Sequence, residues 1–424
     1  MKKGLLIFIL SSMMISLQLS AEKKTLTVDE IIRRLDQTDP EIAASRFRVI
    51  AARKTAEKSN SAYYPKIELQ GLVPVPGGLP GSYGEIGVRG VMISPFHTGN
   101  SIGFLGTYTL FDFGRTKNAV KAAEQDELTK KEEARIARIN TIQNTLHIYY
   151  DCIKLQSLSE VWKEKRKRLK YIQQEVSRFV STGQRSVVDS YMIKSHVERI
   201  ETQLKIFENQ YVHSQEKLSL LLSIPAEEMA YASADKMQEP PSSDGVNFAE
   251  NPFIKKAESD LLTSRAKVDA AKAGNLPEIK SMGSVGDYDS ARIVPKQNWA
   301  IGIGFSMPLF EGFKIQKEIE EAEALSSQKL KELEAARKST QETNMKIQEA
   351  IDTSKIRLKH LADELKIAEE GYRVASSRYS SFQGTLIDLR ETIVNLYRVK
   401  AEVIDAKVQL NLYQHLFYLV NGNL

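Results

Sequence analysis

Two short polar segments contain the candidate functional side chains of this sequence. "RFVSTGQRSVVDS" covers residues 178–190 and "RYSSFQGTLIDLRE" covers residues 378–391, each lying between long stretches of helical periodicity. In the second turn Asp388 and Glu391 are three residues apart, so both carboxylates fall on one helical face, one turn apart. Such a pair can attract cations. The alternative is a solvated helix start, where acidic side chains are favoured by the helix dipole in any protein.

The rest of the sequence contains no recognisable catalytic or metal-binding pattern. The histidines are scattered, with no pair at metal-ligand spacing, at positions 97, 147, 196, 213, 360 and 415. The sequence lacks the phosphate-loop, nucleophile-elbow and zinc-protease motifs. The glycine-rich segment "GGLPGSYG" does not lie between a strand and a helix, as a phosphate loop would. We therefore predict that the chain is not an enzyme and uses no cofactor or metal.

Composition favours long solvated helices over a compact globule. The 424 residues are 27% charged and only 8% aromatic, and the mean hydropathy is −0.33. The formal charge of +5 is weak for this length, and no basic stripe alternates with aromatic residues, so nucleic acid is not an expected partner. The chain has one cysteine, Cys152, which excludes an intramolecular disulfide and favours a packed small side chain over a reactive thiol.

The N-terminus is typical of an exported protein. "MKKGLLIFILSSMMISLQLSA" (residues 1–21) has a dibasic start, an apolar run and small residues at its end, which predicts a secretory signal peptide. A transmembrane anchor is the alternative, but the apolar run is short for a membrane span. After residue 21 no stretch reaches 18 apolar residues. Any membrane insertion of the mature chain is therefore expected to use strands.

The sequence contains an internal repeat. "DPEIAASRFRVIAARKTAEKSNSAYYPKIELQG" (39–71) aligns without a gap on "NPFIKKAESDLLTSRAKVDAAKAGNLPEIKSMG" (251–283). "TLFDFGR" (109–115) likewise matches "PLFEGFK" (308–314), and the two polar turns follow in the same order. We predict a first repeat at 22–226, an inter-repeat linker at 227–250 and a second repeat at 251–424.

Each repeat contains two long segments with almost no glycine or proline. At about 1.5 Å per residue the longest would span ~100 Å and its partner ~60 Å, so a third, shorter helix is expected to stack on the partner. Helices this long that are not apolar enough to span a membrane must bury their apolar stripe against neighbouring helices, as in a coiled coil. The predicted long helices are 115–182 and 185–224 in the first repeat and 313–383 and 385–421 in the second, with short helices at 41–63 and 253–275.

In four segments the spacing of apolar residues changes from the 3.6-residue period of a helix to the two-residue period of a strand. In "NWAIGIGFSMPLF" (298–310) Trp299, Ile301 and Ile303 alternate with small residues, and segments 66–73, 101–111 and 278–286 alternate in a similar way. Such segments are typical of transmembrane barrel strands. A Gly- and Pro-rich insert (74–100) interrupts the first hairpin, while the second occupies 277–310. Four strands cannot close a barrel, so several copies would have to contribute hairpins. Soluble hairpins packed on a core are the alternative.

In this order, and repeated twice, these motifs resemble the TolC-type outer-membrane factors, the exit ducts of Gram-negative efflux pumps and type I secretion systems. The resemblance covers essentially the whole mature chain. It implies a mainly α fold with a transmembrane β part: a duplicated repeat of long helical hairpins and β-hairpins. Three copies would form a twelve-stranded β-barrel in the outer membrane, continued by an α-helical coiled-coil tunnel in the periplasm. The implied partners are two further copies, outer-membrane lipid, a periplasmic adaptor (membrane fusion) protein and an inner-membrane transporter of the RND, ABC or a similar class.

The same resemblance implies roles for residues of the two turns. Asp388 and Glu391 match acids that ring the periplasmic aperture, where three copies would concentrate negative charge and raise the affinity of the carboxylates for protons. Tyr379 and Asp189 match residues that hold this end closed; a half-buried tyrosine and a first-turn acid are the alternative. The adaptor contact is expected at the turns themselves, at Arg178, Thr182, Gly183, Arg378, Phe382 and Gly384. The recurrence of Arg178 and Arg378 could also reflect repeat symmetry or a carbonyl contact at a helix end.

Two positions depart from the family pattern. Gly384 stands where the family has a latch arginine, and the next residue, Thr385, is no substitute. Phe382 stands where the turn has its glycine, and the first turn is one residue longer, with Gly183. The expected function is a passive exit duct opened by its partners, and the sequence does not identify the cargo. The rival hypothesis is a periplasmic coiled-coil scaffold or adaptor without a pore, which would leave the four alternating segments and the constant offset between repeats unexplained.

Overall fold

The computed structural model describes residues 24–72, 101–237, 250–288 and 296–421. The chain divides into two compact units, and each contains segments of both repeats. The first unit comprises Met1–Ala43, Arg138–Val246 and Thr343–Leu424, and the second comprises Ala44–Ala137 and Asn247–Glu342. The predicted signal peptide, the insert at 74–100 and residues 238–249 of the predicted linker lie outside the described residues.

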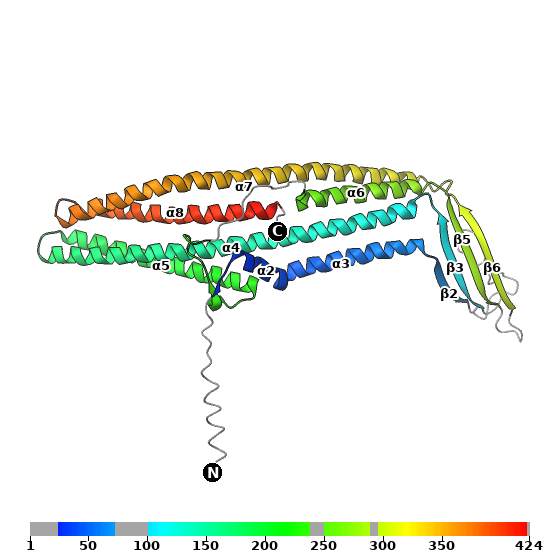
Figure 1. Cartoon of the computed structure of the whole chain (residues 1–424), viewed down its shortest axis with the longest axis horizontal. Helices are drawn as coiled ribbons and strands as arrows, with labels where there is room; N and C mark the ends of the chain where they lie inside the picture. The colour runs from blue at the N-terminus through cyan, green and yellow to red at the C-terminus, as the bar shows by residue number, and fades with distance from the viewer. Residues whose placement is uncertain (1–23, 73–100, 238–249, 289–295, 422–424) are drawn as a thin grey trace, which may run out of the picture. The chain divides into compact units, whose positions relative to one another are not determined.

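The helices of the two repeats correspond closely in length (Figure 1). The long helices α4 and α7 each have 67 residues, their partners α5 and α8 have 36 and 35, and the short helices α3 and α6 have 21 and 22. Their bounds are α3 Pro40–Asn60, α4 Arg115–Ser181, α5 Val187–Leu222, α6 Pro252–Ala273, α7 Lys314–Ser380 and α8 Leu386–Val420. Within the described residues, no helix is both long enough and apolar enough to cross a membrane.

One helix was not predicted from the sequence. Helix α2 (Val28–Thr38) begins at Thr27, whose hydroxyl accepts a hydrogen bond from the Glu30 N–H. Its residues Ile31 and Leu35 are fully buried. Thr27 followed three residues later by Glu30 is an N-capping pattern, and apolar residues at 28, 31 and 35 have helical spacing, so the signal was present in the sequence.

The beginning of the predicted linker is structured. After α5, a 3-10 helix (Ala226–Glu228) leads into strand β4 (Met229–Ala230), which pairs in parallel with strand β1 (Lys24–Thr25). Met229 and Tyr231 are buried in the core of the first unit. This segment therefore packs against the helices, and a free linker can begin only after it.

Two apolar clusters form the core of the first unit. One surrounds α2 and the middle of α4, and includes Ile142, Leu146 and Ile153. The other lies where α4, α5, α7 and α8 approach the two polar turns, and joins Val176, Ile193, Tyr379, Leu389 and Tyr397 among others. Helices α4 and α5 lie side by side, as do α7 and α8 (Figure 1). Near the two turns the long helices thus bury apolar residues against neighbouring helices, as coiled-coil packing requires.

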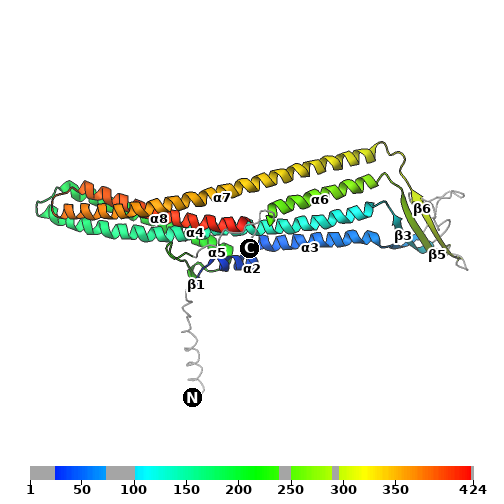
Figure 2. The same cartoon turned by 45° about the horizontal axis from the view of Figure 1, so that its top comes forward.

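The second unit contains a four-stranded antiparallel sheet (Figure 2). Its order is β2-β3-β5-β6, and β3 of the first repeat pairs with β5 of the second, so both predicted hairpins belong to one sheet. The strands are β2 Lys66–Leu72, β3 Ser101–Phe111, β5 Glu278–Tyr288 and β6 Lys296–Ser306. Strand β6 ends at Ser306, four residues before the predicted end of this segment.

One face of this sheet is apolar and exposed. Leu69, Phe104, Val285 and Trp299 lie directly opposite one another across the four strands, and each is more than half exposed. On β6, Ile301, Ile303 and Phe305 are 76%, 74% and 75% exposed, whereas the alternating Ala300, Gly302 and Gly304 are only partly exposed. The predicted alternation along 298–306 is therefore present in the structure.

The matched motifs "TLFDFGR" and "PLFEGFK" form the connections from strand to long helix. In the first, the Asp112 carboxylate accepts hydrogen bonds from the N–H groups of Gly114 (3.1 Å) and Thr116 (2.7 Å), which satisfies donors at the start of α4. Gly114 and Gly312 both have positive φ, at 87° and 61°. Glycine is favoured there because this backbone conformation is costly for other residues.

Candidate functional site

The two polar turns are helical hairpin turns with the same design, shifted by one residue. In the first turn the N–H groups of Gln184 and Arg185 both donate to the Phe179 carbonyl, and Gly183 takes the positive φ of 74°. In the second turn the N–H groups of Gln383 and Gly384 both donate to the Arg378 carbonyl. These bonds satisfy carbonyls that a helix end leaves unpaired. They also explain why α7 ends at Ser380, before the predicted residue 383.

Phe382 takes the position that glycine has in the first turn. Its φ is +61°, a conformation that costs a non-glycine residue about 1 kcal/mol. Its ring packs edge to face against Phe179 of the first turn, with centroids 4.8 Å apart. Apolar contact between the two turns therefore offsets the backbone cost.

Arg185 links the two turns and was not singled out in the sequence. Its guanidinium donates to the Gly384 carbonyl (2.8 Å) and more weakly to the Tyr379 carbonyl (3.4 Å). It also lies over the rings of Tyr379 and Phe382, 4.7 Å and 5.5 Å from their centroids. Position 384 itself has no arginine, and its carbonyl is instead bound by an arginine from the first turn of the same chain.

A close approach between the second turn and the end of α7 accounts for Gly384. A Cβ atom at this position would lie 3.1 Å from the Arg378 Cβ and 3.2 Å from the Tyr379 backbone nitrogen. Both distances are shorter than ordinary contacts, so a larger residue would push the turn away from the helix. An arginine at 384 would not fit this turn as it stands.

Tyr379 is fully buried beneath this link. Its hydroxyl has no hydrogen-bond partner among the described residues, so the structure shows no Tyr379–Asp189 hydrogen bond within the chain. Burial raises the pKa of Tyr379, the positive charge of Arg185 opposes that shift, and the negative charge of Asp189 adds to it. The two residues expected to form the latch thus lie near enough to interact electrostatically, with the hydroxyl still unpaired.

The two expected aperture acids make local contacts within their own helix. Thr385 and Asp388 form a reciprocal capping box, in which the Asp388 N–H donates to the Thr385 hydroxyl (3.1 Å) and the Thr385 N–H donates to the Asp388 carboxylate (3.3 Å). The Thr385 hydroxyl also donates to that carboxylate (2.8 Å). These bonds hold the pKa of Asp388 below its ordinary value, and the positive charge of Arg378 acts in the same direction. Glu391 pairs with the adjacent Arg390. In the single chain Asp388 therefore caps the start of α8, and the shift of its pKa is opposite to the one expected for a ring of copies.

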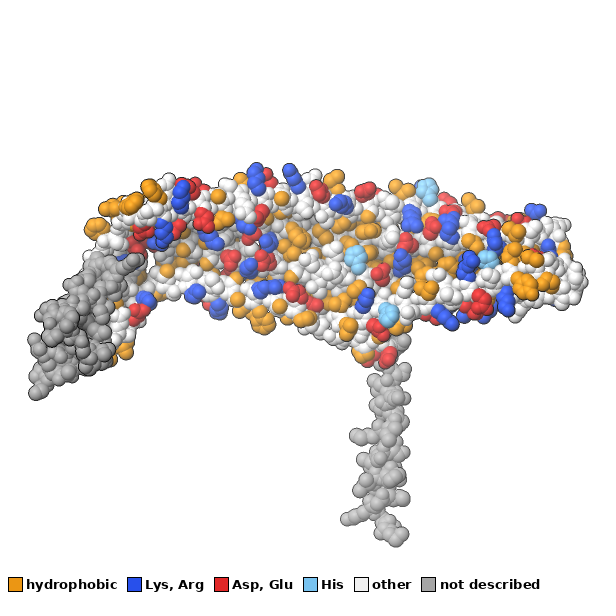
Figure 3. Space-filling model, turned by 180° about the vertical axis from the view of Figure 1, so that it is seen from behind, with side chains coloured by type: hydrophobic (Ala, Val, Ile, Leu, Met, Phe, Trp, Pro, Cys, Tyr) orange, Lys and Arg blue, Asp and Glu red, His pale blue; other side chains and the backbone are white. Residues whose placement is uncertain are grey.

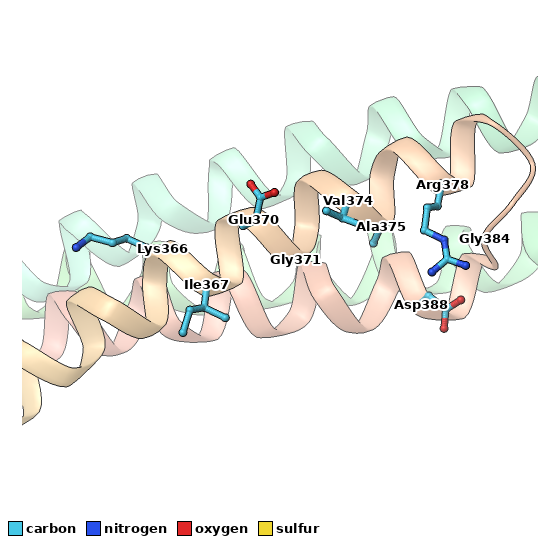
Figure 4. A pocket seen from close by; sticks show the side chains of 9 residues that line it. All are labelled: Lys366, Ile367, Glu370, Gly371, Val374, Ala375, Arg378, Gly384 and Asp388. Carbon is cyan, nitrogen blue, oxygen red and sulfur yellow. The ribbon is translucent and has the colours of Figure 1, made fainter.

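The remaining predicted residues lie on the exposed surface of the turns. Thr182 donates its hydroxyl to the carbonyls of Arg178 and Phe179 at the end of α4. The Arg178 guanidinium lies over its neighbour Phe179, 5.3 Å from the ring centroid, whereas Arg378 points toward Asp388 (Figure 4). The two repeated arginines therefore have different surroundings despite their matching positions.

Comparison with known families identifies the chain. A family model described as "Outer membrane efflux protein" matches residues 82–223 and 248–415, which together exceed half of the sequence. The chain therefore belongs to the outer membrane efflux protein family. It is an outer-membrane protein that extends into the periplasm, and its family and fold are those of channels rather than of enzymes.

Individual relatives agree with this assignment. Nodulation protein T of Rhizobium leguminosarum bv. trifolii is 23% identical over 343 residues, covering 77% of this chain and 73% of that protein. The outer membrane protein VceC of Vibrio cholerae superposes with a TM-score of 0.79 at 16% identity, over 93% of this chain and 96% of VceC. The open state of the outer membrane channel MtrE of Neisseria gonorrhoeae gives 0.77 at 17% identity, over 93% and 88%. At these identities the superpositions establish the fold.

Proposed function

We propose that three copies of this chain form a gated exit duct, which passively conducts substrates delivered by a periplasmic adaptor and an inner-membrane transporter. Efflux pumps and type I secretion systems are the two assemblies such a duct would serve. The cargo would be selected by the transporter, because the duct itself contributes a passage rather than a binding site.

The exposed apolar face of the four-stranded sheet carries this proposal. A large exposed apolar surface on a soluble protein is costly, whereas the same face is favourable against lipid. Within the described residues, β2 and β6 are edge strands with unpaired backbone groups, and such edges are not tolerated in the hydrocarbon layer. Pairing β6 of one copy with β2 of the next would remove every edge.

The number of copies follows from strand number and from the resemblance. Barrels close with about eight strands or more, so two copies would give eight and three would give twelve. The resemblance to TolC-type factors favours three. In a threefold assembly the two turns of each chain would gather around one axis. Along the chain each turn is separated from the strands of its repeat by a 67-residue helix.

In this proposal the turns form the gated periplasmic end and the contact for the adaptor. Three copies each of Asp388 and Glu391 would place negative charge at the aperture, favour cations and disfavour anions. The capping contact of Asp388 does not conflict with this role, because its carboxylate remains exposed. Tyr379, Asp189 and the link made by Arg185 would determine how firmly the end is closed.

The test is the ion selectivity of the purified channel in planar bilayers. We expect the double variant Asp388→Asn, Glu391→Gln to lose cation preference and block by divalent cations relative to wild type. The matched control neutralises Glu349 and Asp352, an exposed pair with the same spacing in the middle of α7. If both double variants behave like wild type, or if the control changes selectivity as much, the aperture assignment is wrong.

Fractionation tests the duct itself. A detergent-resistant oligomer that co-purifies with the outer membrane agrees with the proposal. Release of the mature chain as a monomer without membrane would instead favour the pore-free scaffold.

A further inference from the structure

A group of cations with too few acids lies between α4 and α8 of the first unit. The ammonium groups of Lys165 and Lys400 are 5.8 Å and 5.5 Å from the ring centroid of Tyr397. The nearby Glu164 carboxylate pairs with Arg168 (3.3 Å) and with Lys400 (3.1 Å). It also accepts the Tyr397 hydroxyl (3.1 Å). Three cations and one carboxylate thus lie around this ring, and the carboxylate already has three partners.

Lys165 is the cation of this group that lacks an acceptor. It is only 6% exposed, and its ammonium makes no hydrogen bond or ion pair with any residue that the structure describes. Burial lowers the pKa of Lys165 to about 8, so the side chain is still mostly protonated at neutral pH. Because a buried charge without a partner is costly, this site would be stabilised by a negative group that the chain itself does not provide.

The indole of Trp162 adds a second unpaired donor beside Lys165. The Lys165 ammonium lies over this ring, 4.5 Å from its centroid, and the ring stacks on Phe207 of α5. The buried Trp162 Nε1 has no hydrogen-bond acceptor within the described part of the chain, and neither has the hydroxyl of Ser159, one turn earlier on α4. Lysine and tryptophan side chains have donors and no acceptor, so neither can satisfy the other. A group that binds both must be an acceptor.

Other side chains show that the surroundings of Lys165 are positive. Burial lowers the pKa of His196 on α5, and nearby positive charges lower it further. These charges belong to Arg390, Arg199 and Lys165, and Glu391 acts weakly in the opposite direction. On the face seen in Figure 3, by contrast, acidic and basic side chains are interspersed over the helices. The excess of cations is therefore a local feature of the place where α4, α5 and α8 meet.

We propose that Lys165 and Trp162 bind a small inorganic anion of the halide class, for which chloride is the natural candidate. The ammonium would approach the anion from above the ring and the indole N–H from its edge, with the Ser159 hydroxyl available as a third donor. A monatomic anion accepts hydrogen bonds from any direction, whereas a carboxylate or phosphate favours parallel donors such as the arginine fork. The bound anion would compensate the excess positive charge and hold α4 against α8. This site does not depend on the proposed duct.

Fluorescence of Trp162 in the full-length protein provides the first test. The chain has two tryptophans, so Trp299→Phe leaves Trp162 as the single reporter. Iodide quenches indole fluorescence on contact. In detergent at constant ionic strength, with gluconate as the replaced anion, we expect quenching that saturates with iodide and is reversed by chloride.

The variants locate the anion. In the Trp299→Phe background, Lys165→Met should raise the iodide concentration for half-maximal quenching by roughly ten-fold or more, because it removes a hydrogen bond from a charged donor. The matched control Lys167→Met removes an exposed lysine two residues away and should leave this concentration unchanged.

Thermal unfolding followed by circular dichroism provides a second test that needs no tryptophan reporter. A ligand that binds only the folded chain raises its melting temperature. We expect wild type and Lys167→Met to melt at a higher temperature in chloride than in gluconate of equal ionic strength. Lys165→Met should lose this difference, and Trp162→Phe, which keeps an aromatic ring but removes the N–H donor, should reduce it. In gluconate Lys165 has no partner, so only the difference between the two salts reports the anion.

Two results would overturn the proposal. One is quenching that rises linearly with iodide and is the same with and without Lys165, which would show that water satisfies the donors. The other is a chloride effect on melting that both Lys165→Met and Trp162→Phe retain. If Lys165→Met does not fold, Trp162→Phe decides by the melting assay alone. Each of these results leaves the proposed duct standing.

Discussion

The link made by Arg185 provides the sharpest test of how the two turns are held together. Replacing Arg185 with alanine removes the hydrogen bond to the Gly384 carbonyl and the contacts with the rings of Tyr379 and Phe382. A hydrogen bond from a charged donor contributes about 1.5–3 kcal/mol. A cation–π contact adds roughly 0.5–2 kcal/mol, depending on exposure. Since Arg185 is only partly buried, we take about 3 kcal/mol for the whole link.

Hydrogen exchange at the second turn measures this loss directly. The N–H groups of Gln383 and Gly384 are protected by the Arg378 carbonyl, and they exchange when the turn opens. A loss of about 3 kcal/mol corresponds to roughly hundred-fold faster exchange of these amides. Amides in the middle of α4 should be unaffected. Arg185→Lys should lie between, because a lysine keeps the charge but lacks the planar fork that can serve two carbonyls.

Arg178→Ala is the matched control. Arg178 lies on the same turn, but its ring contact is with its own neighbour Phe179, and its side chain donates no hydrogen bond to the second turn among the described residues. The reasoning is refuted if Arg185→Ala accelerates exchange at 383–384 by less than about ten-fold, or if Arg178→Ala does so equally.

Two further predictions concern buried charge and turn packing. Lys165 is only 6% exposed, faces the Trp162 ring at 4.5 Å and has no ion pair within the described residues, and burial lowers its pKa from 10.5 to about 8. The unfolded chain therefore binds more protons between pH 8 and 10.5, so wild-type stability should rise across that window by about 3 kcal/mol. Lys165→Met should lose this rise and, after subtracting the cation–π contact, be roughly 1–2 kcal/mol more stable at pH 7, as measured by chemical unfolding in detergent; an unchanged pH profile would contradict the assignment. Gly384→Arg should destabilise the second turn by about 1–3 kcal/mol, because the added Cβ crowds Arg378 and Tyr379, whereas Gln383→Arg at the exposed neighbouring position should not; thermal unfolding of the two variants decides, and equal melting temperatures would show that the crowding is relieved at no cost.

The helix bounds and strand faces could be predicted because their signals are local. The turns between long helices are marked by glycine, serine and threonine, and the predicted helix 115–182 differs from α4 by one residue. The alternation of Trp299, Ile301 and Ile303 with small residues appears as alternating exposure on β6. Periodicity depends only on the geometry of the element itself, so it can be read without knowing what the element packs against.

The contacts of the candidate site could not be predicted in the same way. Arg185 and Gly384 are 199 residues apart in sequence, and neither turn alone indicates that they meet. The family pattern places an arginine at position 384 itself, whereas in the structure the arginine beside Gly384 comes from the other turn. A helix start at Asp388 was the alternative prediction, and Thr385 precedes Asp388 at the spacing of a capping box.

The duplication, the long helices and the alternating strands could be predicted from the sequence, because repeats, periodicity and turn residues are properties of neighbouring residues. The pairing of β3 of the first repeat with β5 of the second, and the contact of one repeat's arginine with the other repeat's turn, became visible only in three dimensions. Both outcomes depend on how distant segments pack. That packing is governed by shape and by the pairing of buried polar groups, which local sequence patterns do not record.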